Sequence, residues 1–229
     1  MIYITGDTHG EIDISKINGK YFKEQKYLTS KDFLIIAGDF GVIWEDNRTQ
    51  KYWLNWLEKK SFTTLFIDGN HENFDLINSY IVENWNGGVI HKINNKVIHL
   101  MRGQIYSIDN TKIFTFGGGE STDKNHRIEG ISWWKEEMPS YDEYGEGLKN
   151  LEKNNWNVDY IVTHTAPSNI ISILEENHEI YNKKNELSDY FEQISKKVKF
   201  KKWFFGHYHL DKIISNEFYA LYQNKLRIE

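Results

Sequence analysis

Short unbroken runs of apolar residues divide the first third of the chain. They cover residues 2–5, 33–37 and 64–67, and each is followed within two residues by glycine next to aspartate or asparagine. Runs of this kind are typical of parallel strands buried on both faces. More than twenty residues separate one run from the next, and between 47 and 60 aromatic and aliphatic residues recur at helical spacing. The pattern predicts three parallel strands joined by two crossover helices, in the right-handed sense that such connections almost always take.

The pattern changes between residues 89 and 119. Four short apolar segments follow one another there, with turn residues such as asparagine and aspartate between them; they lie at 89–90, 97–100, 105–108 and 113–116. Short segments separated by such turns are typical of antiparallel hairpins. We therefore predict an antiparallel meander in this part of the chain.

Helices and strands alternate again in the second half. Ser140, followed three residues later by Glu143, matches the capping-box pattern and predicts a helix from there to about Lys153. A second helix fits 187–198, and strand-like segments lie at 160–163, at 203–205, near Ile213 and at 219–222. These elements indicate an α/β fold. No internal repeat or linker divides the 229 residues, so we expect a single domain over 1–229.

The composition fits a packed domain and removes several classes of protein. Hydrophobic residues make up 39% of the chain and aromatic residues 15%, with only two prolines, which excludes a disordered or collagen-like protein. No cysteine is present, which excludes disulfide frameworks, thiolate-bound zinc, iron–sulfur clusters and cysteine nucleophiles. Any metal ion must therefore be bound by nitrogen and oxygen.

Charge and terminal sequence bear on partners and location. The net charge is −5, and the 28 basic residues are interleaved with acids and asparagines instead of standing in blocks. Nonspecific binding to nucleic acid or to a membrane surface is therefore not favoured, although a local basic groove stays open as an alternative. The chain starts without a basic leader and contains no apolar stretch long enough to cross a bilayer. We expect a cytoplasmic protein.

Candidate chemistry gathers where the predicted strands end. The carboxyl ends of strands in an open α/β sheet border the crevice in which ligands bind, so residues far apart in sequence can meet there. The residues concerned are Asp7 and His9 after the first strand, Asp39 after the second, Asn70 and His71 after the third, His164 after the strand at 160–163, and His207 and His209 after the strand at 203–205.

These residue types are metal ligands. Asp7 and His9 are two positions apart, as are His207 and His209, and in extended backbone such pairs point to the same side. The oxygens of Asp7, Asp39 and Asn70 and the imidazoles of His9, His164, His207 and His209 are more donors than one ion needs if it is to keep positions open for a substrate. The set predicts two divalent ions. Mixed oxygen and imidazole ligands suit manganese, iron or zinc, and magnesium less well.

The order of these motifs resembles the calcineurin-like metallophosphoesterase superfamily. The chain carries Gly-Asp-x-His-Gly at 6–10, Gly-Asp at 38–39, Gly-Asn-His-Glu at 69–72, a lone histidine at 164 and Gly-His-x-His at 206–209, and the whole set is far more specific than any piece of it. The resemblance implies a two-sheet α/β/β/α sandwich. It also implies a first ion held by Asp7, His9 and His209, a second held by Asn70, His164 and His207, Asp39 bridging both, and His71 as the catalytic acid.

By this resemblance the protein is a dinuclear-metal phosphoesterase. A metal-bridging hydroxide would attack the phosphorus, and His71 would assist the leaving group. The substrate would be a small phosphate ester or a phosphoprotein. One alternative is a phosphodiesterase or nuclease acting on nucleotides or nucleic acid, which the acidic charge balance does not favour. Another is a scaffold that keeps the metal-binding fold without catalysis.

One departure from the family pattern concerns the substrate. Protein phosphatases of the superfamily continue Gly-Asp-x-x-Asp-Arg-Gly, whereas residues 40–44 here read Phe-Gly-Val-Ile-Trp. The arginine that binds phosphate and the aspartate that orients the catalytic histidine are both missing. Arg102 and Arg127 are the candidates for a bidentate phosphate contact; an ordinary ion pair is the alternative for each of them.

Overall fold

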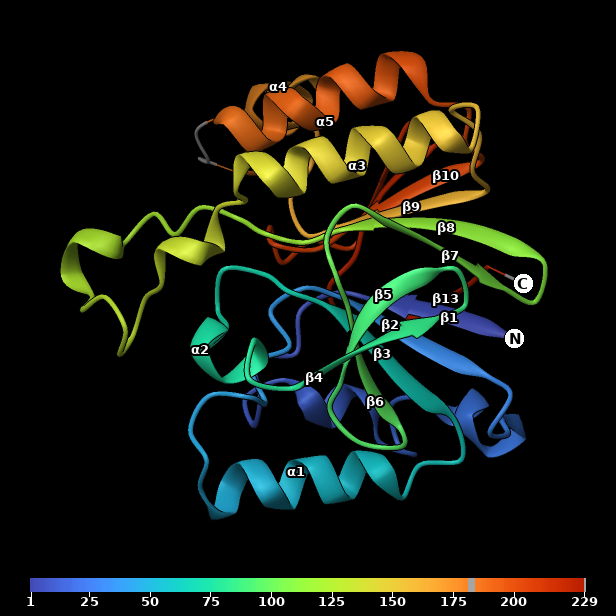
Figure 1. The fold of residues 1–229 in the computed structure, drawn as a ribbon, viewed down its shortest axis with the longest axis vertical. Helices are drawn as coiled ribbons and strands as arrows, with labels where there is room; N and C mark the ends of the chain where they lie inside the picture. Colours follow the sequence, from blue (N-terminus) through green and yellow to red (C-terminus); the bar gives the residue numbers. More distant parts are fainter. Residues whose placement is uncertain (181–183, 229) are drawn as a thin grey trace.

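Two mixed β-sheets pack face to face and helices cover their outer faces (Figure 1). The computed structural model describes residues 1–180 and 184–228. A core cluster that includes Ile4, Ile35, Val162 and Phe204 fills the space between the sheets. This confirms the α/β fold predicted from the residue pattern and the two-sheet sandwich that the resemblance implied.

The first sheet contains the three strands predicted near the start of the chain. Its strand order is β13-β1-β2-β3-β6-β5-β4. β1, β2, β3 and β6 are parallel neighbours, and β13, β5 and β4 pair antiparallel to theirs. The bounds are β1 Ile2–Thr5, β2 Phe33–Ala37, β3 Thr63–Ile67, β4 Ile81–Trp85, β5 Gly88–Lys92, β6 Val97–Leu100 and β13 Leu226–Arg227.

The second sheet is built from the later part of the chain. Its order is β11-β12-β10-β9-β8-β7. The four inner strands are parallel, and β7 and β11 are antiparallel edge strands. The bounds are β7 Gln104–Ile108, β8 Thr111–Phe116, β9 Tyr160–Thr163, β10 Lys202–Phe205, β11 Lys212–Ile214 and β12 Phe218–Ala220.

The predicted meander is not one continuous unit. β5 and β6 belong to the first sheet, whereas β7 and β8 belong to the second. The chain crosses between the sheets at 101–103, where Gly103 adopts a φ of 72° that favours glycine. Alternating segments reveal strands but not their partners. Here the partners are decided by β3 and β9, which offer parallel edges to β6 and β8.

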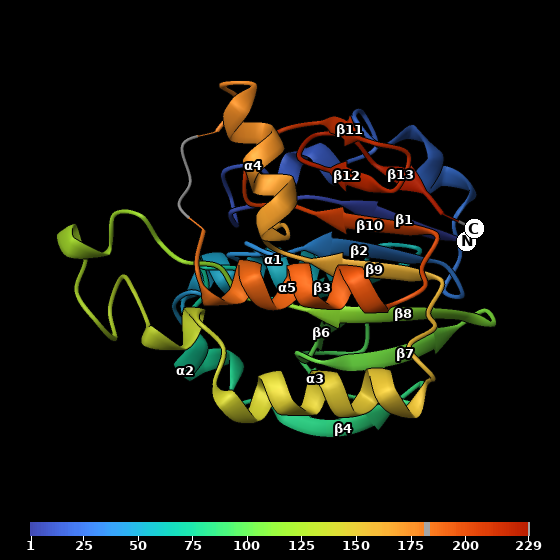
Figure 2. The same cartoon turned by 90° about the horizontal axis from the view of Figure 1, so that it is seen from above.

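Helices cover both outer faces, α1 on the first sheet and α3, α4 and α5 on the second (Figures 1 and 2). The capping box of Ser140 and Glu143 starts α3 as predicted, and an asparagine side chain caps α1 and α5. α2 and α4 were not predicted. The bounds are α1 Arg48–Glu58, α2 Phe74–Ile77, α3 Tyr141–Lys153, α4 Ser168–Glu176 and α5 Glu186–Lys197.

The first predicted crossover helix is absent from residues 6–32. Two 3₁₀ helices, Ile14–Ile17 and Lys23–Tyr27, stand in its place. The few apolar residues of this segment, among them Phe22, are buried one by one under the first sheet. They do not form the continuous stripe that stabilises an α-helix by packing, so this prediction was wrong.

An arm formed by residues 117–140 projects from the body of the molecule (Figure 1). It contains two 3₁₀ helices, Lys124–His126 and Lys135–Glu137. At the other end of the sheets the two termini lie next to each other (Figure 2). Within residues 1–180 and 184–228, every helix is too short or too polar to cross a membrane.

Candidate metal centre

The structure brings the seven predicted metal ligands and the predicted catalytic acid, His71, together at the carboxyl ends of strands from both sheets. Asp7 and His9 follow β1, Asp39 follows β2, Asn70 and His71 follow β3, His164 follows β9, and His207 and His209 follow β10. Residues from positions 7 to 209 thus meet at one site, as the strand-end argument predicted.

The backbone at these strand ends is unusual. His9, Asp39, His207 and His209 all have positive φ values, between 41° and 67°. Such conformations cost a non-glycine residue free energy, and they cluster at functional sites, where the surrounding fold holds them. The turns let each side chain point back across the ends of the strands.

Two glycines make room for the buried carboxylates. A Cβ atom at Gly206 would lie 2.1 Å from Asp7 Oδ1, and one at Gly69 would lie 2.1 Å from Asp39 Oδ1. Any larger residue at either position would displace the carboxylate. Glycine is therefore required here by close approach.

A first group of donors consists of Asp7, His9 and His209, whose ligand atoms all lie within 4.8 Å of one another. His209 Nε2 is 3.3 Å from Asp7 Oδ2. His9 Nε2 is 3.2 Å from Asp39 Oδ2. This is the set that the family resemblance implied for one ion, with Asp39 at its border.

A second group surrounds the Nε2 atom of His164. Asn70 Oδ1 lies 3.1 Å from this atom, His207 Nδ1 lies 3.2 Å from it and Asp39 Oδ1 lies 3.3 Å from it. The two oxygens of Asp39 therefore face different groups, Oδ2 toward His9 and Oδ1 toward His164. A carboxylate placed in this way can bridge two ions.

The donor set fits divalent cations. Asp7 and Asp39 are 0% and 2% exposed, and buried carboxylates require a compensating positive charge. Burial alone would lower the pKa of His164, but Asp39 and Asp7 raise it to about 10. Burial and the neighbouring His164 lower the pKa of His207 to about 4. A proton on His164 thus compensates the carboxylates in the metal-free protein, and a divalent ion bound to the same atoms would replace it.

A second layer of contacts orients two of the imidazoles. His9 Nδ1 lies 3.1 Å from Asp13 Oδ2, and Tyr222 Oη donates a hydrogen bond of 3.0 Å to the same oxygen. The ring of His209 stacks on Tyr222, with 4.6 Å between the ring centroids. Sequence reasoning missed both partners: Asp13 lies one helical turn after His9, but nothing local marks Tyr222.

Removal of Asp13 should weaken metal binding. We expect Asp13→Ala to lower the affinity of the first ion about 10–100-fold, because His9 loses the acceptor that fixes its ring. Tyr222→Phe should have a smaller effect, since it keeps the stacking on His209. Calorimetric titration of each metal-free variant with manganese measures its metal affinity. Tyr219→Phe is the control, because its hydroxyl donates to the carbonyl of Asn216, away from the donor groups. Unchanged affinity in Asp13→Ala would show that the carboxylate does not support the site.

His71 lies at the edge of the centre. Its backbone N–H donates a 2.7 Å hydrogen bond to Asp39 Oδ1, and Arg127 Nη1 lies 3.2 Å from its Nδ1. A guanidinium only donates, so Nδ1 accepts and the proton of the neutral ring is on Nε2. Burial lowers the pKa of His71; Asp39 opposes this shift and Arg127 adds to it.

Of the two candidate arginines, only Arg127 reaches the centre. It lines a pocket of about 190 Å³ together with Asp39, His71, His207 and His209.

Arg102 is placed elsewhere. Its Nε and Nη2 atoms donate to Asp68 Oδ2 at 2.8 and 2.6 Å, and Nη2 also donates to the carbonyl of Glu136. At 7% exposed, Arg102 belongs to a buried ion pair beside β3 instead of a phosphate site. No local pattern indicated that Asp68, which also contacts His99 Nε2 at 3.1 Å, would be buried opposite it.

Glu72 holds the backbone turn that follows Asp39, a role that was not predicted from the sequence. Its buried carboxylate accepts hydrogen bonds from the backbone N–H groups of Phe40 and Gly41, at 2.6 and 3.2 Å. These bonds hold the turn that follows Asp39. Burial and the nearby Asp39 raise the pKa of Glu72 well above its usual value.

Comparison with protein-family models gives a match over most of the chain. The sequence model of the calcineurin-like phosphoesterase family matches residues 1–211, which include every residue of the centre described above except Tyr222. The search of curated proteins finds no match.

Proposed function

The chain belongs to the calcineurin-like phosphoesterase family, and from that premise we propose that it hydrolyses phosphate esters with the help of two divalent metal ions. The observation that carries the proposal is the placement of Asp39. One of its oxygens faces the group of Asp7, His9 and His209, and the other faces the group around His164. A shared carboxylate between two donor groups is the arrangement that a two-ion centre needs.

Each ion would be held by residues already described. Asp7, His9 and His209 would bind the first, Asn70, His164 and His207 the second, and Asp39 both. Manganese, iron or zinc suits this mixture of oxygen and imidazole donors. When bound, the two ions would lower the pKa of a water shared between them and neutralise charge on the phosphoryl oxygens.

His71 would donate a proton to the leaving oxygen through Nε2. Arg127 supports this role because it donates to Nδ1 and so keeps the proton of the neutral ring on the other nitrogen. The family pattern places an aspartate in this orienting role. A cation in its place lowers the pKa of His71 instead of raising it, so His71 would act as a neutral donor. Arg127, which lines the same pocket, would also contact the phosphoryl group.

The proposed substrate is a small phosphate ester. The pocket at the centre holds about 190 Å³, and the arm of residues 117–140 contributes Glu120 and Asp123 to its wall. These carboxylates and the net charge of −5 disfavour a long polyanion such as nucleic acid.

The test is hydrolysis by metal-stripped protein resupplied with manganese, zinc or iron. We expect metal-dependent release of phosphate from an aryl phosphate monoester, with the bis-aryl diester measured beside it to assign the ester class. Folded protein that binds the metals and hydrolyses neither ester would contradict the proposal and favour the scaffold alternative.

His71→Ala tests the proton donor. We expect the rate to fall about 10²–10⁴-fold for an alkyl phosphate, and less for a nitrophenyl phosphate, because nitrophenolate leaves without needing a proton. His126→Ala, an exposed histidine on the arm, is the control. Equal losses on the two substrates would rule out proton donation to the leaving group.

A further inference from the structure

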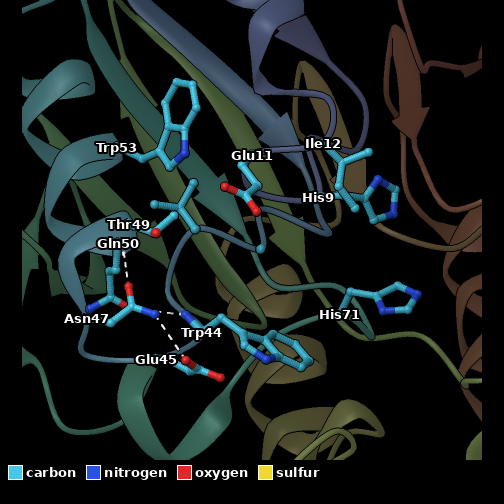
Figure 3. Close-up of a pocket in the computed structure, with 13 residues that line it drawn as sticks. His9, Glu11, Ile12, Trp44, Glu45, Asn47, Thr49, Gln50, Trp53 and His71 are labelled. Atoms are coloured by element: carbon cyan, nitrogen blue, oxygen red, sulfur yellow. Dashed lines mark hydrogen bonds between the residues drawn. The ribbon is translucent and has the colours of Figure 1, made fainter.

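A second, larger pocket of about 450 Å³ opens beside the metal centre (Figure 3). Its walls come from residues 9–12 after β1, from 41–47 after β2 and from the first turns of α1. His9 and His71 line one end of it, and Trp53 and Asn47 lie at the other. His71 also lines the pocket of the metal centre, so the two pockets meet at the proposed proton donor. The larger one therefore lies where the leaving group of a phosphate ester would extend.

Apolar atoms make up most of the exposed surface of this leaving-group pocket. Val42 contributes to it, as do Trp44, Trp53 and Ile12, and Thr49, Asn47 and Gln50 add polar groups on one side (Figure 3). A pocket whose exposed surface is mostly apolar and carries fixed polar groups is typical of a small-molecule site. The two indoles suit a flat ring, because stacking between a base and an aromatic side chain is favourable for any base.

The wall around Trp44 is held in place before any ligand binds. Its backbone N–H donates to Gln50 Oε1 at 3.0 Å, and its carbonyl accepts from Asn73 Nδ2 at 2.8 Å. Its indole packs edge-on against Trp134, with 5.4 Å between ring centroids, and Trp134 Nε1 donates to Asp75. A pre-formed wall binds a ligand without the cost of ordering it.

Charge restricts what can enter. Glu11 and Glu45 are the charged side chains of the pocket wall apart from the histidines, and the wall contains neither lysine nor arginine. Carboxylates accept hydrogen bonds from amino and hydroxyl groups, but they repel a second phosphate. A sugar bisphosphate or a nucleic-acid strand therefore fits poorly, whereas an uncharged ring with amino or hydroxyl donors fits well.

We propose that this pocket binds the nucleoside of a mononucleotide, with the base against Trp44 and Trp53 and the ester oxygen beside His71. This inference rests on the proposed function, since it names the substrate class of the same centre. Its hydrolysis step would add water to the phosphorus, break the bond to the nucleoside oxygen, and release inorganic phosphate and the nucleoside.

Binding of free nucleosides to metal-free protein tests the pocket without using activity. We expect at least one of adenosine, guanosine, cytidine and uridine to bind in equilibrium dialysis, and Trp53→Leu and Trp44→Leu each to weaken that binding about tenfold. Trp156→Leu is the control, because Trp156 is also half-buried but follows α3 on the second sheet and does not line the pocket. Absence of binding by all four nucleosides, or equal weakening by the control, would overturn the inference.

A kinetic comparison tests the charge argument. The metal-loaded protein should hydrolyse the matching nucleoside monophosphate at least about tenfold more efficiently, in kcat/KM, than glycerol phosphate. It should hydrolyse the nucleoside 3′,5′-bisphosphate less efficiently than the monophosphate. Glu45→Gln should reduce this difference in kcat/KM. Asp46→Asn is the control and should leave the difference unchanged, because Asp46 pairs with Lys51 outside the pocket. Efficient hydrolysis of glycerol phosphate with no preference for the nucleotide would overturn this inference and leave the proposed function standing. Nucleoside binding without hydrolysis of any ester would contradict the proposed function and support the nucleoside pocket.

Discussion

Asp39→Asn should eliminate metal-dependent hydrolysis. Asparagine has one acceptor oxygen where aspartate has two, and its amide would place N–H donors against either His9 or His164, whose nitrogens lie 3.2 and 3.3 Å from the present carboxylate. The buried negative charge that would attract the two proposed cations would also be lost. Loss of a residue that only supports a ligand costs about 10–100-fold, so we expect loss of a shared ligand to exceed a hundredfold in kcat/KM. Metal content per chain should fall as well.

Asp32→Asn is the matched control for this experiment. Asp32 is a buried aspartate just before β2, whereas Asp39 lies just after it, and its contacts are to the amino terminus and Thr29. The control can cost stability but should leave metal content unchanged in the folded protein. Retention of two ions per chain and of activity within tenfold in Asp39→Asn would refute the bridging role.

Arg102→Met should be the most destabilising of the substitutions considered, at about 3–5 kcal/mol in the free energy of unfolding. It removes one partner of a buried ion pair and leaves the carboxylate of Asp68 without its main compensating charge. Burial would raise the pKa of Asp68, but Arg102 and His99 hold it well below its usual value. The stability from this pair is therefore present at neutral pH and lost as the pH falls and Asp68 becomes protonated. Urea unfolding at several pH values measures it.

Two further variants test whether this loss of stability arises from the unpaired carboxylate of Asp68. Arg48→Met removes an exposed arginine at the start of α1 and should change stability by less than about 0.5 kcal/mol. The double variant Asp68→Asn, Arg102→Met should be more stable than Arg102→Met alone, because no charge is left buried without a partner. An Arg102→Met protein that folds normally but has a raised KM would instead support the phosphate contact considered from the sequence.

Many strands and helices of the fold could be predicted from local sequence patterns. The runs at 2–5, 33–37 and 64–67 became β1, β2 and β3 because a strand buried on both faces needs an unbroken apolar run. Ser140 started α3 because its capping bonds lie within four residues. The segment at 6–32 and the division of the meander could not be read locally, because they depend on which distant surfaces and strand edges are free.

The candidate site likewise contains residues that local sequence predicts and residues that it does not. The convergence of its candidate ligands could be predicted because each follows the end of a strand, and parallel strands bring their ends together. Its supports were missed because they arise from contacts between distant segments. Tyr222 and Asp13 are 209 positions apart, and Arg127 reaches His71 across 56. The leaving-group pocket was missed for the same reason, since three separate segments form its walls.

The contacts of the carboxyl-terminal segment have a consequence for the order of folding. β13 pairs with β1, and Tyr222 contacts both Asp13 and His209, so segments about two hundred positions apart must meet before the centre has all its supports. Contacts that close such long loops form more slowly than local ones. We therefore expect metal affinity to appear late in refolding, after the helices and the neighbouring parallel strands have formed.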